Sequence, residues 1–181
     1  MRLIDKTPKM SRRTLLRTGS MTAAAVAVVP SPAITGMAWA AAPAAVSADT
    51  FATLVKMARD IYPHDKLSDQ HYAKVMEGLD AAAKDDAAAK ALLEEGVAGL
   101  NTAAIGMKYG GYAEVSDEKE RVAILSGIEA TPFFQKVRGS LVTGIYNNPE
   151  VWAVLGYEGE SASKGGYINR GFDDIDWLSQ G

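Results

Sequence analysis

The run DAAAKDDAAAKALLEEG, residues 80–96, constrains the fold more than any other stretch of this chain. Alanine, leucine, lysine and glutamate have high intrinsic helix propensity, so the run favours helix, with a break near Asp85 and Asp86. No segment of the sequence alternates apolar and polar residues with the period of a strand over any length. The sequence therefore predicts an all-α fold: a small helical domain followed by an irregular, aromatic, glycine-rich C-terminal tail.

Capping residues and prolines set the expected helix ends. Asp49 or Thr50 caps a helix that begins at Phe51, and Pro63 stops it at Tyr62. Other starts are expected at Ser68 or Asp69, at Ser116-Asp117 with Asp117 and Glu120 as a capping box, and at Thr131-Pro132. The helix from Thr131 is expected to end near Asn147-Asn148-Pro149, while Gly96 and Gly99 loosen the stretch before a turn at Gly110-Gly111.

These signals divide the chain into four parts. Residues 1–40 read as a targeting segment and 41–49 as a flexible lead-in. Residues 50–160 are the expected helical domain, and 161–181 the irregular tail.

Two adjacent arginines, Arg12 and Arg13, stand just before Leu15 and Leu16 and a mildly hydrophobic stretch. This pattern is similar to the twin-arginine signal, which directs folded proteins across a membrane. Ala38 and Ala40 match the small-x-small pattern of a cleavage site, which predicts processing after Ala40. The alternative of an uncleaved membrane anchor is disfavoured, because about 20 apolar residues are needed to span a bilayer.

Charge and cysteine content narrow the function classes. The leader holds six of the 19 Lys and Arg residues and one of the 22 Asp and Glu residues, which leaves 13 basic and 21 acidic residues in 41–181. That acidity argues against nucleic-acid binding, which needs clustered Lys and Arg. The absence of cysteine excludes disulfides, iron–sulfur clusters and covalently attached haem in this chain.

The two histidines, His64 and His71, are the only candidates for chemistry within the helical part. With Asp65 and Asp69 they could form a weak metal site, or simply cap a helix at the surface. We therefore predict no catalytic, cofactor-binding or metal-binding residue in this chain.

Large aromatic side chains gather near the C-terminus, where little helix is expected to bury them. They are Trp152, Tyr157, Tyr167, Phe172 and Trp177. Two interpretations stay open: the tail wraps back onto its own domain, or these residues bind another protein, for which Trp and Tyr are favoured anchors. In the second interpretation, Asp173, Asp174 and Asp176 beside Phe172 and Trp177 would give the tail acidic selectivity.

One motif in this region resembles a known family. Residues 131–159 carry a helix followed by Tyr146, Pro149, Trp152, Gly156, Tyr157 and Gly159, and residues 51–65 form an opening helix that closes on an Ile-x-Pro turn. Both features are similar to those of the gluconate 2-dehydrogenase subunit 3 family.

The resemblance implies a role that the residues alone do not indicate. Members of that family are non-catalytic small subunits of periplasmic dehydrogenases acting on sugars, sugar acids or alcohols. A large flavoprotein of the glucose–methanol–choline type holds the FAD, and a multihaem cytochrome c subunit commonly takes the electrons. The small subunit is thought to assist maturation of the large one and to carry it through the twin-arginine translocase.

The sequence thus predicts a periplasmic accessory subunit that holds no cofactor itself and has the flavoprotein and the translocase as partners. Two alternatives remain. One is a stand-alone periplasmic helical protein with a binding or structural role. The other is a small enzyme that uses His64 and His71.

Overall fold

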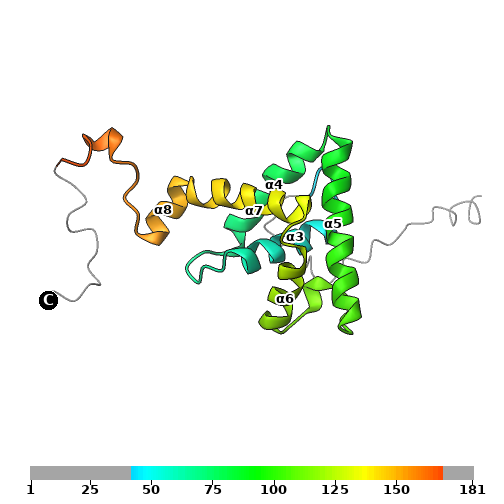
Figure 1. Ribbon diagram of the computed structural model, residues 1–181. Coiled ribbons are helices and arrows are strands. Elements are labelled where there is room, and N and C mark those ends of the chain that lie inside the picture. Colours follow the sequence, from blue (N-terminus) through cyan, green and yellow to red (C-terminus); the bar gives the residue numbers. More distant parts are fainter. Residues whose placement is uncertain (1–41, 169–181) are drawn as a thin grey trace, which may run out of the picture. The chain divides into compact units, whose positions relative to one another are not determined.

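The computed structural model describes residues 42–168, and these residues form helices with no strand among them (Figure 1). The elements are α3 (Ala48–Ile61), α4 (Asp69–Ala83), α5 (Ala87–Gly106), η1 (Tyr112–Glu114), α6 (Glu118–Ile128), α7 (Pro132–Tyr146), α8 (Pro149–Leu155) and η2 (Ala162–Lys164), where η marks a 3-10 helix. The all-α prediction is confirmed. Within 42–168 no helix is both long and apolar enough to cross a membrane.

Local capping explains most helix starts. Thr131 caps α7 as expected, because its hydroxyl oxygen accepts the Phe134 N–H at 3.3 Å. Asp86 lies in the predicted break and caps α5, because its carboxylate accepts the N–H groups of Ala88 and Ala89. These side chains satisfy backbone donors that a helix leaves unpaired at its first turn.

Two expected starts differ in detail. Helix α3 begins at Ala48 rather than Phe51, because the Ser47 side chain, and not Asp49 or Thr50, provides the cap by accepting the Thr50 N–H. Asp117 caps α6 by accepting the Lys119 N–H at 2.9 Å. Glu120 does not complete a capping box, since its carboxylate accepts the Tyr109 hydroxyl at 2.5 Å.

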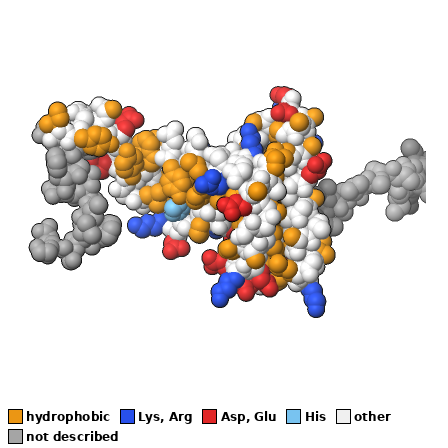
Figure 2. All heavy atoms as spheres, viewed as in Figure 1, with side chains coloured by type: hydrophobic (Ala, Val, Ile, Leu, Met, Phe, Trp, Pro, Cys, Tyr) orange, Lys and Arg blue, Asp and Glu red, His pale blue; other side chains and the backbone are white. Residues whose placement is uncertain are grey.

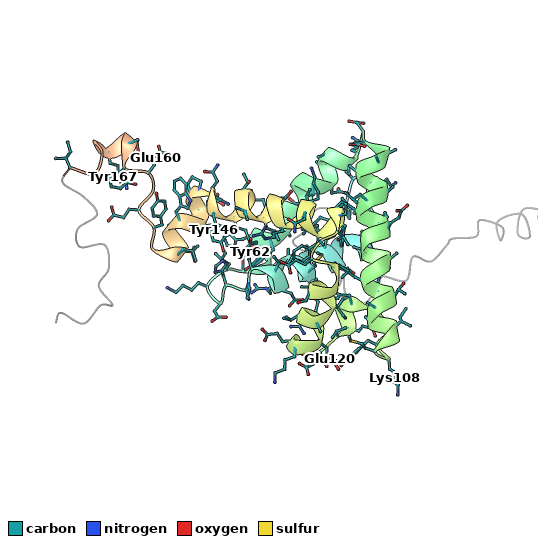
Figure 3. The ribbon with its side chains drawn as sticks, in the orientation of Figure 1. Tyr62, Lys108, Glu120, Tyr146, Glu160 and Tyr167 are labelled. Atoms are coloured by element: carbon teal, nitrogen blue, oxygen red, sulfur yellow. The ribbon has the colours of Figure 1, made fainter. Side chains whose placement is uncertain are left out.

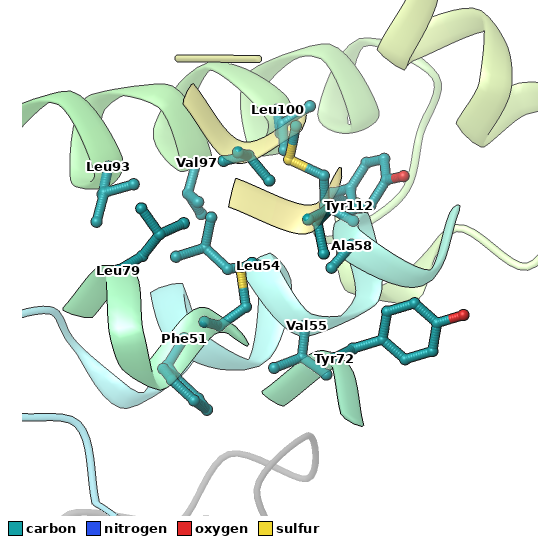
Figure 4. Packing of buried hydrophobic residues seen from close by; sticks show 14 of the residues in the cluster. Phe51, Leu54, Val55, Ala58, Tyr72, Leu79, Leu93, Val97, Leu100 and Tyr112 are labelled. Atoms are coloured by element: carbon teal, nitrogen blue, oxygen red, sulfur yellow. The ribbon is translucent and has the colours of Figure 1, made fainter. Parts of the chain in front are cut away.

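The core lies around α3, which contacts α4, α5, α6 and α7 (Figure 4). Leu54, Met57, Leu100 and Leu141 are fully buried there. Helix α5 runs unbroken through Gly96, although glycine was expected to loosen it. A Cβ at Gly96 would lie 2.2 Å from the Phe133 ring, so this glycine makes room for packing between α5 and α7.

The lead-in differs from the flexible segment that its composition predicts. The N–H groups of Ala44, Ala45 and Val46 all donate to the Asp80 carboxylate, at 2.5, 3.0 and 2.8 Å. Glu94 accepts the next N–H, that of Ser47, at 2.6 Å. Val46 is buried and its N–H requires an acceptor, and together these two carboxylates fix the lead-in onto α4 and α5.

Helix α8 (Pro149–Leu155) extends regular structure past the expected end of the helix that starts at Thr131. Asn148 caps it by accepting the Glu150 N–H, and Pro149 occupies its first turn. The same Asn-Pro pair that ends α7 therefore starts another helix. Residues 156–168 contain only the short η2, in agreement with an irregular tail over its described part.

Candidate partner-binding surface

The predicted site residues fall into two groups. Arg12, Arg13, Leu15, Leu16, Ala38, Ala40, Phe172 and Trp177 lie outside the described residues. The other three lie within the described residues: Trp152 is on α8, and Tyr157 and Tyr167 follow it. The site is therefore built from these three aromatic residues and their neighbours.

Trp152 lies on α8 and is held at two points. Its indole N–H donates to the carbonyl oxygen of Tyr146, the last residue of α7, at 2.7 Å. Its ring meets the Tyr157 ring edge to face, with centroids 5.5 Å apart and planes at 82°. Aromatic pairs favour this geometry because the positive edge of one ring meets the negative face of the other.

Glycines place Tyr157 against that indole. Gly156 has φ +81°, a left-handed conformation that suits glycine, and it ends α8. The Tyr157 N–H then donates to the Trp152 carbonyl at 2.8 Å, the 6→1 bond of a Schellman motif. Gly159 also has positive φ, and a Cβ there would lie 3.3 Å from the Trp152 ring.

The residues on which the family resemblance rests thus form one structural unit. We call it the Trp152 unit: Tyr146, Pro149, Trp152, Gly156, Tyr157 and Gly159. Each member has a physical task, from starting α8 to turning the chain beneath the indole. The spacing of the motif is explained by this local packing.

Two residues distant in sequence extend the unit across the surface. Tyr62 meets the Tyr146 ring edge to face at 5.7 Å. The His64 Nε2 atom lies 2.8 Å from the Tyr146 hydroxyl, and their rings are also perpendicular. We name Tyr62, His64, Tyr146, Trp152 and Tyr157 the aromatic surface. Tyr62 and Tyr146 lie side by side in Figure 3, and hydrophobic side chains gather beside a histidine over α7 and α8 in Figure 2.

Two members of the aromatic surface are exposed to solvent, and the other three are partly buried. Tyr146 is 40% exposed and Tyr157 is 52% exposed, while Tyr167 further along is 70% exposed. Partial burial raises the pKa of the Tyr146 hydroxyl above its ordinary value, and nearby Tyr62 and Tyr72 raise it further. The hydroxyl is neutral at physiological pH and bonds to His64 without adding charge to the surface.

A hydrogen-bonded turn fixes the positions of Tyr62 and His64. The Tyr72 hydroxyl donates to the Tyr62 carbonyl at 2.6 Å and accepts the His64 N–H at 3.2 Å. Arg59 lies over the Tyr72 ring, 4.8 Å from its centroid, and donates to the Leu67 carbonyl. The hydrogen-bonded turn between α3 and α4 therefore holds Tyr62 and His64 in place within the aromatic surface.

The histidines are engaged separately. His64 contacts Tyr146, whereas the His71 Nδ1 atom lies 3.1 Å from the Ser68 hydroxyl at the start of α4. In the described part of the chain no three His, Asp or Glu side chains are grouped so that they could hold a metal ion. His64 therefore belongs to the aromatic surface, and His71 to the start of α4.

A second polar cluster lies in the interior. The Arg121 Nε–H donates to both Asp60 oxygens at 2.9 and 3.0 Å, and the Tyr112 hydroxyl donates to Asp60 at 2.7 Å. Burial, followed by the Asp60 hydrogen bond, raises the pKa of Tyr112 far above its ordinary value. This Asp60 cluster joins α3, η1 and α6, and no buried side-chain N or O atom in 42–168 lacks a partner.

Sequence reasoning named Trp152, Tyr157 and Tyr167 but missed Tyr62, His64 and Tyr146 as members of one surface. The family motif includes Tyr146, yet its contacts with Tyr62 and His64 span more than eighty residues of sequence. Comparison of the chain with protein-family models, curated proteins and solved structures finds no match.

Proposed function

We propose that this chain is the non-catalytic small subunit of a periplasmic FAD-dependent dehydrogenase complex, and that it binds the flavoprotein through the aromatic surface. One observation carries the proposal. Tyr146 and Tyr157 are held in position by contacts with other side chains, yet Tyr146 is 40% exposed and Tyr157 is 52% exposed. Tyr and Trp are enriched at binding hot spots because they bury large areas with little loss of side-chain freedom. A rigid, exposed aromatic surface suits a stable partner.

The chemistry of the partner comes from the resemblance carried by the Trp152 unit. It is a glucose–methanol–choline-type flavoprotein that holds FAD and oxidises a sugar, sugar acid or alcohol. A multihaem cytochrome c would accept the electrons in complexes that contain a third subunit. The small chain contributes binding and escort rather than catalysis.

Export completes the proposed role. The pair Arg12-Arg13 engages the twin-arginine translocase, which carries folded proteins, so a flavoprotein that has already bound FAD travels with this chain. In cells, Arg12→Lys with Arg13→Lys is expected to leave both proteins in the cytoplasm. Arg17→Lys in the same leader is the matched control and is expected to leave export intact. A flavoprotein that still reaches the periplasm beside the double variant contradicts the escort role.

Purification of the exported chain from its own host tests the complex directly. The expected product contains a second, larger protein and shows flavin absorption, with haem bands where a cytochrome is present. A folded chain that elutes alone, without flavin, overturns the proposal.

A variant pair tests the surface. Tyr157→Ala removes an exposed ring of the aromatic surface, and we expect it to reduce recovery of the flavoprotein at least tenfold, the effect of about 1.4 kcal/mol. Ile105→Ala removes a side chain that is 58% exposed on α5, away from this surface, and serves as the control. Equal recovery with both variants contradicts binding through the aromatic surface.

The second candidate is a stand-alone periplasmic helical protein with a binding or structural role. The closed core favours it, because every buried side-chain N or O atom in 42–168 has a hydrogen-bond partner within this chain and needs no second protein. This candidate predicts a stable monomer after export and no flavoprotein in the purification described above. The same experiment therefore separates the two functions.

A further inference from the structure

A groove of about 700 Å³ runs between α4 and α7, on residues that neither the aromatic surface nor the Asp60 cluster uses. The two helices approach closely at Gly144, where a Cβ would lie 2.6 Å from the Val75 side chain. Elsewhere small residues line the groove, among them Gly78, Ala82 and Gly139. The groove is thus a shallow, mostly apolar channel in the surface.

The floor of the groove has space for side chains from another segment. A Cβ built on Gly78 or on Gly139 would meet no atom within 4 Å. Glycine inside a helix destabilises it relative to alanine, and neither position needs glycine for packing within the described fold. Larger side chains can therefore enter here without displacing the helices.

Positive charge borders the groove. Lys74 on α4 and Lys136 on α7 both line it and are exposed to solvent. Lys74 makes only a loose ion pair with Glu150, at 3.6 Å, with both side chains at least 66% exposed. Lys136 has no ion-pair partner within residues 42–168. An occupant with apolar side chains and carboxylates would match this groove.

We propose that the C-terminal segment FDDIDWL, residues 172–178 of the same chain, binds in the α4–α7 groove. Charge selects it over the other undescribed end of the chain. Residues 1–41 carry six basic residues and one acidic residue, whereas 169–181 carry three aspartates and one arginine. Phe172 and Trp177 would occupy the apolar floor while the aspartates meet Lys74 and Lys136.

The segment, when extended, is longer than the groove. The 13 residues from 169 to 181 can span at most about 45 Å when extended, and the face of α7 from Gln135 to Asn148 is about 20 Å long. Asn148 both lines the end of the groove and caps α8, so the chain leaves the helical domain at that end. Gly165 and Gly166, with φ +89° and +83°, turn the chain sharply before the segment.

This inference does not rest on the proposed function. It concerns how the tail is bound within a single chain, and it holds for an accessory subunit and for a stand-alone protein alike. Failure of the experiment below would leave the flavoprotein complex untouched, because that complex is tested by purification and by Tyr157→Ala.

The test follows Trp177 in the full chain labelled with 5-fluorotryptophan, whose fluorine resonance is assigned by its loss in Trp177→Phe. The solvent-isotope shift of this resonance reports exposure to water. We expect a smaller shift than in a synthetic peptide of residues 168–181. Gly78→Leu with Gly139→Leu fills the groove and is expected to raise the shift to the peptide value.

Gly99→Leu is the matched control for the filled groove. Gly99 is an exposed helical glycine on α5 that also has open space around it, but it does not line the groove. The control is expected to leave the Trp177 resonance unchanged. Far-ultraviolet circular dichroism and thermal unfolding verify that each variant is folded, and leucine has higher helix propensity than the glycine it replaces.

A charge exchange tests the ionic contacts. Lys74→Glu with Lys136→Glu is expected to release Trp177, and adding Asp173→Lys, Asp174→Lys and Asp176→Lys is expected to restore its protection. Lys90→Glu, on the exposed face of α5, is the control. Rescue by the exchange is a result that general destabilisation of the chain would not produce.

Four outcomes overturn the proposal. If Trp177 is as exposed in the native chain as in the peptide, the segment does not bind in the groove. Protection that survives the filled groove places the segment elsewhere. Protection that rises with protein concentration, together with a dimer in light scattering, assigns the groove to a second copy. Protection found only in a complex purified from the host assigns it to a partner protein.

Discussion

The Asp60 cluster and the aromatic surface both contain hydrogen-bonded tyrosines, but the two sets of tyrosines differ in how far they are exposed. Tyr112 is fully buried and donates to Asp60, which Arg121 also binds. Tyr146 has a polar partner as well, in His64, but 40% of it remains exposed. A tyrosine whose ring and hydroxyl are both enclosed contributes to folding. A tyrosine whose position is fixed but whose ring faces solvent is ready to contact another molecule.

This contrast predicts that stability and partner binding can be changed separately. Residues of the Asp60 cluster should alter unfolding strongly and partner binding only through unfolding. Residues of the aromatic surface should do the reverse, because solvent already covers much of their area. The following variants are ordered from the largest expected effect on stability to the smallest.

Asp60→Ala should give the largest effect, since it leaves Arg121 and Tyr112 without their carboxylate. Removal of one partner from a nearly buried ion pair costs about 3–5 kcal/mol, and Asp60 and Arg121 side chains are only 10% and 15% exposed. Urea unfolding measures the loss. Asp69→Ala breaks the exposed pair with Arg59 and should cost less than about 1 kcal/mol. Equal costs would show that the Asp60 cluster is no more enclosed than the surface.

Asp80→Ala should come next and tests whether the lead-in belongs to the interior. The carboxylate accepts three consecutive N–H groups, and its loss should cost about 2–3 kcal/mol. Hydrogen exchange at Ala44, Ala45 and Val46 should speed up in the variant more than exchange in α7. Asp80→Asn keeps one acceptor oxygen and should lie between wild type and alanine. Unchanged exchange at these three amides would contradict the contact.

Alkaline pH should sharpen the comparison through Tyr112. Its pKa is raised in the folded chain, mainly by burial and then by Asp60, whereas in the unfolded chain it ionises near pH 10. The folded state therefore holds its proton above pH 10 and the unfolded state does not. Stability should be retained below that pH and should fall by about 1.4 kcal/mol per pH unit above it for this one group.

Tyr112→Phe removes the ionising hydroxyl. Above pH 10 the free energy of unfolding should then fall less steeply with pH, by the contribution of one proton. Ile105→Ala, which changes no ionisable group, is the control and should leave the slope as it is in wild type. Urea unfolding at several pH values between 9 and 11 measures both slopes. A slope unchanged in Tyr112→Phe would mean that the hydroxyl is not enclosed.

Tyr157→Ala should have the smallest effect on stability. It removes one edge-to-face contact with Trp152 from an exposed position, worth about 0.5 kcal/mol. Thermal unfolding should therefore change little in the variant that we expect to lose the flavoprotein. A loss of several kcal/mol would show that the Tyr157 ring stabilises the fold as a buried side chain does.

Several helix starts were accessible from sequence, because a local capping residue determines them. Thr131 with Pro132 predicted α7, and the Asp85-Asp86 break predicted the start of α5. Asn148-Pro149 shows the limit of such reasoning, because proline stops the preceding helix and also begins the next one. The pattern was interpreted as an end alone, so α8 was not expected.

Contacts between distant residues were not accessible in the same way. Asp80 looked like part of a helix-favouring run, and only the fold brings it to the N–H groups of Ala44 to Val46. The surface contact of Tyr146 with Tyr62 and His64 likewise depends on how α3 and α7 pack. Composition marks aromatic residues as candidates, but packing decides which of them share a surface.

The carboxylates of Asp80 and Glu94 also decide where the chain resists tension. A pull applied to the chain just before residue 44 reaches the hydrogen bonds to α4 and α5 before it reaches the first turn of α3. The force is then shared between two helices instead of unwinding one from its end. Within residues 42–168, these two carboxylates are therefore the first mechanical resistance to such a pull.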